Sequence, residues 1–343
     1  EAGFEGVGHH HNPFGLFQQA VGDRGFRDGL NLLQHTHGII GTGIFAGAGG
    51  NTAGTPAMLL PTIAVLVVLV GYPLVRLVWV SFHEYGRAQI FGRPAEWIGL
   101  DNYRDILTDP QFWRVFWRSL AFCVVNVLAT MTFGILVAVL MTKLHRFFRF
   151  LASLGLLVAW AMPALTAIII WGWMFDTQFG VVNYLLTALT PTDYTGHSWL
   201  IDPMSFYAVA TIVILWQSTP FVAFSVYAAL TQVPEDLLEA AQLDGAGMLK
   251  RGRHVVLPIL RPVLLILVML SIIWDLRVFT QIYALQGIGG IREKTSTLGV
   301  YIYTTSVGSG DFGRGGAMAV ILVLLMMVIG VAYVRSTLRQ DES

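Results

Sequence analysis

Four polar side chains interrupt the long apolar segments of this chain and are its first candidates for chemistry: Asn126, Gln217, Asp275 and Arg277. A polar or charged group is costly inside a lipid bilayer, so such a residue faces a partner helix or a water-filled path. Asp275 and Arg277 are two positions apart and cannot share one helix face. In an apolar segment beginning at Val263, Asp275 lies about 18 Å into the membrane. A structural pair between helices and a cavity-lining role both stay open.

Tryptophan side chains accompany these polar groups. Trp216 immediately precedes Gln217, Trp274 immediately precedes Asp275, and an indole ring offers a flat apolar face on which a ligand can stack. Tryptophan also collects at membrane–water interfaces, so each ring taken alone fits an anchor as well as a ligand contact. The residues with the strongest case for a substrate path are Gln217, Trp216, Trp274, Asp275 and Arg277; further indoles occur at Trp160, Trp171 and Trp173.

No catalytic motif accompanies these residues. The sequence has no G-x-x-x-x-G-K-[ST] phosphate loop, no H-E-x-x-H metal-binding helix and no G-x-S-x-G nucleophile elbow. The single cysteine, Cys123, excludes an intrachain disulfide and a multi-cysteine metal site, and it is expected to face lipid or another helix. We therefore predict no catalytic residue, no metal site and no cofactor in this chain, so that any ATP must be hydrolysed by a partner.

The apolar segments indicate the class of protein. Hydrophobic residues make up 55% of the chain and charged residues 12%, against roughly 25% charged residues in soluble domains. The 21 basic residues balance the 21 acidic ones, which argues against a nucleic-acid partner. A membrane helix needs about 20 apolar residues. Six segments qualify and predict an all-α integral membrane protein: 58–82, 119–142, 151–175, 205–230, 263–285 and 316–334.

Prolines and basic residues refine this prediction. Pro163 and Pro220 fall inside the third and fourth segments, where neighbouring helices can tolerate the kinks that proline introduces. Lys and Arg gather in the loops 143–150 and 231–262 and after residue 334, whereas 176–204 has none. The basic loops are therefore predicted to be cytoplasmic, together with both termini. The loop 83–118 fits this scheme poorly, because it holds five arginines: Arg87, Arg93, Arg104, Arg114 and Arg118.

The charged segment 234–262 predicts a helical hairpin at the membrane surface. Pro234 suits a first helical turn, and the two acidic residues after it lie at the positive end of the helix dipole. Two adjacent alanines allow another surface to approach closely, and Gly245 allows a sharp turn. A second helix is expected over 248–256, ending before Pro258. Such a hairpin is a rigid lever, as force transmission between two proteins requires.

The spacing within this segment resembles the EAA loop of permease subunits of bacterial ATP-driven (ABC) importers. Glu239-Ala240-Ala241 is followed by Asp244-Gly245-Ala246 and then by Leu257-Pro258 at the offsets of that family. The resemblance covers about residues 57–335 and is strongest with the sugar-permease branch, similar to the maltose and glycerol-3-phosphate permeases. It is carried by WIGLDNYRDIL (97–107), WDLRVFTQIYAL (274–285) and STLGVYIYTTSV (296–307).

The resemblance implies a fold, a set of partners and a coupling site. The fold is a type I importer permease, with 57–335 as the transmembrane domain, 231–262 as the cytoplasmic loop that docks on the ATPase, and 336–343 as a cytoplasmic tail. The partners are a second, different permease subunit, two ATPase subunits that bind ATP and Mg, and an extracytoplasmic sugar-binding protein, in a bacterial cytoplasmic membrane. The implied ATPase-coupling residues are Glu239, Ala240, Ala241, Asp244, Gly245, Leu249, Leu257 and Pro258.

One residue departs from the family pattern, and two other hypotheses remain. Gly252 stands where the family usually has an aromatic residue, so docking is expected to rely on Leu249 and Met248. Residues 1–56 are glycine-rich, show no secretory signal and are expected to be poorly ordered. Within them, 38–50 resembles the first helix of secondary transporters, which favours transport driven by an ion gradient. The histidines of this segment would instead favour a membrane-embedded enzyme; they are His9, His10, His11, His35 and His37.

Overall fold

The computed structural model describes residues 54–341, which are almost entirely helical. The chain divides into two compact units, 1–75 and 76–343. The described part of the first unit is one apolar helical stretch formed by α4 (Gly54–Leu66), the π-helical turn η2 (Val67–Gly71) and the start of α5 (Tyr72–Ser81). The histidines of the N-terminal segment and residues 38–50 lie outside the described residues.

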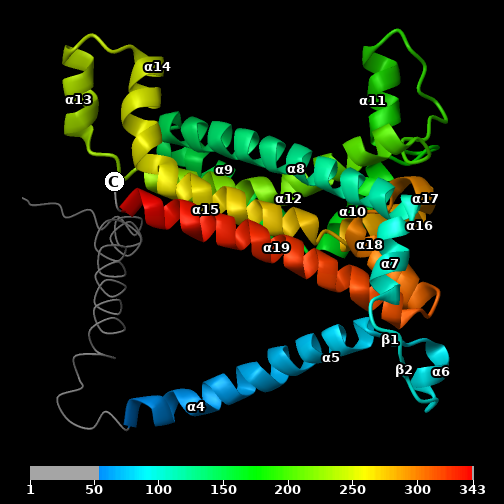
Figure 1. Ribbon diagram of the computed structural model, residues 1–343. Helices are drawn as coiled ribbons and strands as arrows, with labels where there is room; N and C mark the ends of the chain where they lie inside the picture. Colours follow the sequence, from blue (N-terminus) through cyan, green and yellow to red (C-terminus); the bar gives the residue numbers. More distant parts are fainter. Residues whose placement is uncertain (1–53, 342–343) are drawn as a thin grey trace, which may run out of the picture. The chain divides into compact units, whose positions relative to one another are not determined.

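The second unit is a bundle of long helices (Figure 1). Helix α8 packs along α12 and also contacts α15, which in turn contacts α19. A side chain at Gly134 of α8 would overlap Val222 of α12, so this glycine permits close approach of the two backbones. The long helices are α8 (Pro110–Lys143), α9 (Arg146–Ala161), α10 (Ala164–Met174), α12 (Pro203–Leu230), α15 (Leu257–Leu276) and α19 (Phe312–Asp341).

Short elements cover the two ends of the bundle. The hairpin of α13 (Glu235–Leu243) and α14 (Met248–Arg251) projects from one end, which we call the α13 end, and the C-terminal part of α19 reaches the same end (Figure 1). The opposite end, the α11 end, carries a small antiparallel sheet, in which His83 pairs with Trp97. Its elements are β1 (His83–Glu84), α6 (Arg87–Ile90), β2 (Glu96–Trp97), α7 (Asp101–Thr108), α11 (Val181–Leu189), α16 (Thr280–Ile288), α17 (Arg292–Thr295), α18 (Leu298–Tyr303) and η4 (Thr304–Gly308).

The apolar core forms three clusters along the bundle. The first, near the α11 end, joins α10, α12 and α16 around Phe206 and Ile282. The second joins α8, α12 and α15, and it extends from Val233 beside the α13 hairpin to Leu276. The third joins α7, α8, α18 and α19 around Phe112. The second cluster therefore connects the two ends of α15 through continuous side-chain packing.

The six predicted segments are recovered with two changes. Five described helices are long and apolar enough to cross a membrane, and the pair α9–α10 makes a sixth span if it is counted as one. The third segment is not a kinked helix, because it breaks before Pro163 and bends by 104° between α9 and α10. The fifth segment does not run to residue 285, because α15 ends at Leu276 and α16 begins only at Thr280. Pro220 lies inside α12, as expected.

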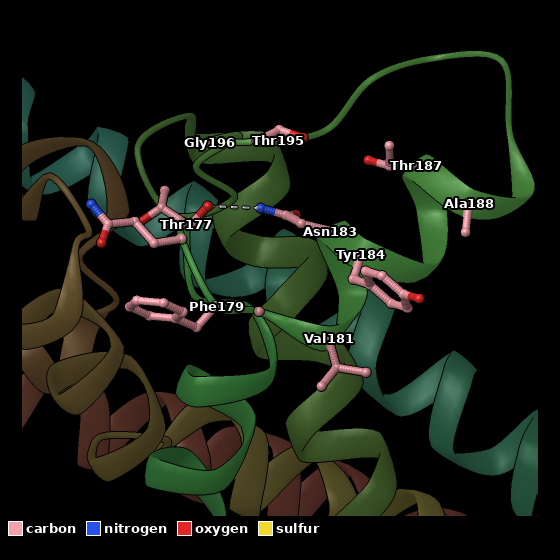
Figure 2. Close-up of a pocket in the computed structure, with 11 residues that line it drawn as sticks. Thr177, Phe179, Val181, Asn183, Tyr184, Thr187, Ala188, Thr195 and Gly196 are labelled. Atoms are coloured by element: carbon pink, nitrogen blue, oxygen red, sulfur yellow. Dashed lines mark hydrogen bonds between the residues drawn. The ribbon is translucent and has the colours of Figure 1, made fainter.

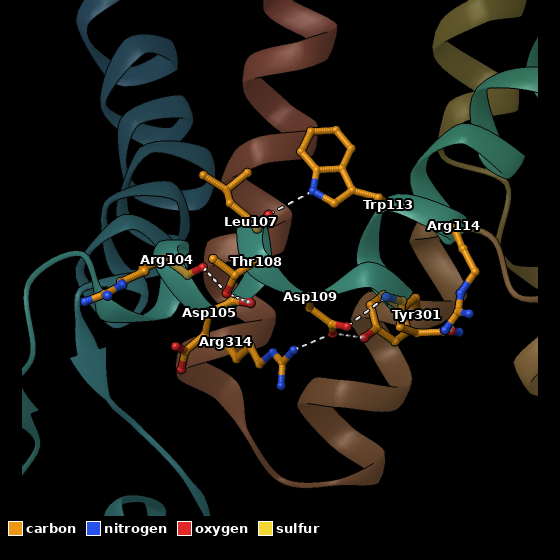
Figure 3. Close-up of polar contacts among 10 residues, drawn as sticks. Arg104, Asp105, Leu107, Thr108, Asp109, Trp113, Arg114, Tyr301 and Arg314 are labelled. Carbon is orange, nitrogen blue, oxygen red and sulfur yellow. Dashed lines mark hydrogen bonds and ion pairs between the residues drawn. The ribbon is translucent and has the colours of Figure 1, made fainter.

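Arginines of the loop 83–118 serve as structural donors at the α11 end. Arg87 donates to the Gly308 carbonyl at 2.7 Å, and Arg118 donates to the Glu293 carbonyl at 3.2 Å. Next to them, an ion pair of 2.6 Å joins Arg314 of α19 to Asp109, the residue that caps α8 (Figure 3). Two of the five arginines of this loop thus join it to neighbouring segments at the α11 end.

Candidate coupling surface and substrate path

Helix α13 ends in a cap that requires glycine. Gly245 has a φ of 76°, in the left-handed region that side chains disfavour. The Ala246 N–H donates to the Ala241 carbonyl at 2.9 Å, and the Gly245 N–H donates to the Gln242 carbonyl at 3.0 Å. This pair of bonds is the Schellman motif, which satisfies the last carbonyls of a helix. Gly245 follows Ala241 by four residues because the Schellman motif places its glycine four residues after the carbonyl that accepts the hydrogen bond spanning more residues.

The tip of this hairpin presents apolar side chains to its surroundings. Leu243 is 89% exposed, Met248 70% and Leu249 87%. No residue from Glu235 to Val256 is buried, and the side chain of Arg251 joins α14 to α13 by one hydrogen bond of 2.9 Å to Gln242. Leu249 and Met248 thus lie where the sequence indicates a docking contact. Leu243 was missed, although an isolated leucine at the end of a charged helix could have indicated it.

The predicted coupling residues lie together on this hairpin and at its base. Glu239, Ala240 and Asp244 are exposed and Ala241 is half-buried. The prediction of a second helix that ends before Pro258 is wrong, because α14 continues through the π-helical turn η3 (Gly252–Val256) into α15. Pro258 occupies the first turn of α15 next to η3, where a π-helical turn and a proline each allow a local bend. Helix α14 of the hairpin is thus the first part of the candidate membrane span that continues as α15.

That continuous helix connects the exposed tip to the opposite half of the bundle. The span from Met248 to Leu276 has 29 residues and is about 43 Å long at 1.5 Å per residue. Leu238 of α13 and Val256 of η3 both pack against the second core cluster, which contains Leu267 and Leu276. A force applied to the hairpin is therefore carried by one helix and by continuous packing rather than by a loose loop.

A cavity of about 280 Å³ lies at the far end of this helix. It forms where two interrupted helices meet α12: the break between α15 and α16 on one side and the first residue of α10 on the other. Irregular backbone at membrane depth is tolerated where it is buried or lines a cavity. The lining residues are Ala164, Ile214, Ser218, Trp274, Asp275, Arg277, Val278, Phe279, Thr280 and Gln281.

The structure brings three of the five predicted path residues together in this cavity. Trp274, Asp275 and Arg277 line it directly. Asp275 lies in the last turn of α15, and Arg277 caps that helix. Of the other two, Gln217 contacts a lining residue: it accepts a hydrogen bond of 3.3 Å from Gln281 and donates one of 3.3 Å to the Met162 carbonyl at the α9–α10 break.

Other candidates have structural roles or point elsewhere. Trp216 packs edge-on against Trp171 at 6.0 Å. Asn126 donates to the Phe122 carbonyl at 2.8 Å, and Cys123 faces the Ile272 carbonyl of α15 at 3.8 Å. The indoles of Trp160 and Trp173 are exposed. Sequence reasoning missed Ser218, Thr280 and Gln281, which line the cavity; a polar pair such as Thr280-Gln281 after an apolar run was the available signal.

These features define a multi-span membrane protein in which a surface hairpin is continuous with a helix that borders an internal cavity. Comparison with known proteins gives the family. Residues 130–341 match the family described as "Binding-protein-dependent transport system inner membrane component", and the chain belongs to it. It is thus a permease subunit of an ABC importer, and in this family a separate subunit carries the ATPase.

Individual relatives extend the match over most of the chain. The diacetylchitobiose uptake system permease DasB of Streptomyces coelicolor is 41% identical over 86% of this chain and 93% of its own length. The sulfoquinovosyl glycerol permease SmoG of Agrobacterium fabrum is 32% identical over 83% and 90%. The trehalose/maltose permease MalF of Thermococcus litoralis is 30% identical over 81% and 91%. The resemblance recognised in the sequence is therefore confirmed.

Solved structures agree on the fold. A bacterial ABC transporter for the import of alginate superposes with a TM-score of 0.70 at 20% identity, covering 82% of this chain and 94% of the other. A second structure, that of an alginate transporter with a periplasmic protein bound, gives a TM-score of 0.69 at 19% identity, over 81% and 91%. The predicted all-α permease fold is confirmed, and the alternative of a secondary transporter driven by an ion gradient is not supported by any of these matches.

Proposed function

We propose that this permease subunit forms half of a sugar translocation pathway and couples it to ATP hydrolysis through the α13–α14 hairpin. The observation that carries the proposal is the continuous helix from Met248 to Leu276, which has an exposed apolar tip at one end and a polar cavity at the other. Closure of the ATPase pair would displace Leu243, Met248 and Leu249, and the helix would move the wall formed by Trp274 and Asp275. The device is rigid-body coupling.

The proposed transporter contains partners on both sides of the membrane. A second, different permease subunit completes the pathway, two ATPase subunits bind ATP and Mg, and an extracytoplasmic binding protein delivers the solute. The α13 end is proposed to be cytoplasmic, because Lys143, Arg146 and Lys250 lie at the end of α8, at the start of α9 and in the short helix α14, whereas residues 176–204, which include α11, have no Lys or Arg. The C-terminal tail then lies in the cytoplasm, and no cofactor is expected in this chain.

The proposed solute is a di- or oligosaccharide. Its support is the identity with permeases for diacetylchitobiose and trehalose/maltose, together with a cavity whose lining combines the Trp274 ring with hydroxyl and amide side chains. Sugar rings have apolar faces that suit aromatic stacking and hydroxyls that suit such partners. In this cavity Gln281, fixed by Gln217, is proposed to orient the sugar, and Arg277 and Asp275 to bind further hydroxyls.

The experiment is uptake by proteoliposomes that contain the assembled transporter with its binding protein. Glu239→Lys places a positive charge on the exposed hairpin, and Gly245→Pro destroys the cap of α13; both are expected to uncouple ATP hydrolysis from uptake while the complex still inserts. Phe91→Ser, which removes an exposed apolar side chain at the α11 end, is the control and should transport normally. Normal transport and ATPase binding by either hairpin variant would refute the coupling assignment.

A further inference from the structure

A second cavity in the second unit lies apart from the one between the broken helices. It lies at the α11 end, has a volume of about 630 Å³, and is formed within residues 177–196 (Figure 2). This volume is in the range of small-ligand sites, about 300–1,000 Å³. One wall is the face of α11 that carries Val181, Tyr184 and Thr187, and another is the segment at Thr195 and Gly196. Nothing in the coupling mechanism uses it.

The cavity is preformed, because its walls are held by buried groups. Asn183, which is 5% exposed, donates to the His197 carbonyl at 2.9 Å and accepts from the Trp199 indole at 2.6 Å. It also donates to the Thr177 carbonyl at 3.4 Å, the contact drawn in Figure 2. Gly180 lies so close to the Asp176 backbone that no side chain fits there. The shape therefore exists before any ligand arrives, which reduces the ordering cost of binding.

The chemistry of the lining selects for an uncharged ligand with both apolar and hydroxyl surfaces. No Asp, Glu, Lys, Arg or His lines the cavity, so an ionic ligand finds no counter-charge among the described lining residues. The rings of Phe179 and Tyr184 are 77% and 73% exposed. The Gln178 side-chain amide and the Tyr184 hydroxyl make no hydrogen bond within the described part of the chain and are available to a ligand. The Thr187 hydroxyl accepts from the Tyr194 N–H at 2.9 Å and still has its own proton to donate. In Figure 2 the Phe179 and Tyr184 rings point to opposite sides, and the Tyr184 side, with Thr187 on the same helix, offers an aromatic face and hydroxyl groups that suit a neutral sugar.

We propose that this cavity is a saccharide-binding subsite for a neutral di- or oligosaccharide, separate from the translocation cavity. The proposal rests on the proposed function, since it names the solute class at a second site of the same subunit. Tyr184 is assigned to pack on a sugar ring, and Gln178 and Thr187 to bind its hydroxyls. The position at the α11 end, opposite the coupling hairpin, would let the solute be held where it enters the subunit.

The test is equilibrium dialysis of labelled diacetylchitobiose and maltose against the assembled complex in lipid nanodiscs, without nucleotide or binding protein. Tyr184→Ala is expected to weaken binding about tenfold, and Tyr184→Phe and Gln178→Ala about fivefold. Leu189→Ala, which removes an 80% exposed side chain of the same helix outside the cavity, should bind as the wild type. An acidic alginate oligosaccharide should not bind at this site.

Each contrary outcome is decisive. Equal affinities for Tyr184→Ala and Leu189→Ala would overturn the subsite, as would equal binding of the acidic oligosaccharide. If the variants alter only the concentration of binding protein that half-saturates ATPase stimulation, the surface is a protein contact and the proposal fails. The titration is repeated with Gln281→Ala, which disables the translocation cavity; binding that persists there isolates the subsite. Loss of uptake with this binding intact would refute the proposed function alone.

Discussion

The α11 hairpin, which is helix α11 with its return loop, and the α13–α14 helical hairpin lie at opposite ends of the bundle and are built in opposite ways. The α11 hairpin, residues 176–202, is closed by its own contacts: Asn183 is buried and hydrogen bonded to both His197 and Trp199, and Leu200 is buried in the first core cluster. The α13–α14 hairpin has no buried residue, and one side-chain hydrogen bond, from Arg251 to Gln242, joins its helices. The polar groups of the α11 hairpin are therefore hydrogen bonded within the hairpin itself. The α13–α14 hairpin instead leaves leucine and methionine side chains exposed.

The difference indicates where each hairpin obtains its stability. Buried polar groups that are fully hydrogen bonded fix a single shape, so the α11 hairpin keeps its cavity without a partner. Exposed leucines contribute nothing to folding until another surface covers them. The α13–α14 hairpin is held by its cap and by the packing of Leu238 and Val256 at its base, and it is suited to a partner that completes it. Changes in the two hairpins should therefore affect different measurements.

The largest effect is expected from the exposed tip. Replacing Leu243 and Leu249 together by serine should weaken binding of the ATPase subunits by about 4 kcal/mol, roughly 1,000-fold, because apolar anchors dominate such interfaces. Thermal unfolding of the solubilised permease should not change, since both side chains are exposed. Affinity is measured by titrating the ATPase against permease in nanodiscs, with Phe91→Ser as the control. A tip variant with a lower melting temperature and normal affinity for the ATPase would show that these leucines stabilise the fold rather than bind the partner.

Next in size is the close approach at Gly180. A Cβ there would overlap the Asp176 carbonyl oxygen and crowd that of Met174, so Gly180→Ala should destabilise the permease by about 3 kcal/mol. The matched change Gly247→Ala, at the N-cap of α14, meets no atom within 4 Å and should cost no more than about 1 kcal/mol, the difference between glycine and alanine at an N-cap. Denaturation of both variants in the same detergent checks the pair. Equal stability would mean that the α11 hairpin is as adaptable as its counterpart.

A smaller loss is expected at Asn183. Asn183→Ala removes the acceptor of the Trp199 indole and the donor to the His197 carbonyl, which should cost about 2 kcal/mol, because unsatisfied buried groups are penalised. Gln242→Ala removes the bond to Arg251 on an exposed surface and should cost less than about 0.5 kcal/mol. Hydrogen exchange of the two hairpins separates the effects. If the two variants lost equal protection in their respective hairpins, Asn183 would not be the stronger structural contact.

The smallest expected effect is a loss of local stability in the α11 hairpin at acidic pH. Backbone N–H groups of Phe179 and Gln178 hold the pKa of Asp176 below its ordinary value of 3.8, and hydrogen bonds from Thr195 lower the pKa of Asp193. A lowered pKa contributes stability that is present above the unfolded value and is lost as the pH falls through the folded value. Protection of the α11 amides, taken relative to intrinsic exchange at each pH, should therefore fall below about pH 4. Replacing both aspartates by asparagine should abolish this dependence; its persistence would assign it elsewhere.

Local features of the sequence predicted much of the coupling hairpin. Pro234, the acidic first turn and the spacing from Ala241 to Gly245 specify a helix and its cap through contacts within a few residues. The continuation through Pro258 was not predicted, because a π-helical turn beside a proline has no strong local signal. The same limit applies to the break before Pro163, where sequence suggested a kink and the chain turns by 104° instead.

The sequence by itself determined that this chain crosses a membrane several times, carries a charged hairpin of the importer type and balances its charge, because hydropathy and helix capping depend on neighbours along the chain. Only the tertiary structure decided which polar residues meet. Ala164, Ser218, Asp275 and Gln281 reach one cavity from three separate parts of the chain, and Asn183 finds Trp199 across a turn. Such convergence depends on where helices break and on how closely they pack, and both follow from contacts between distant residues.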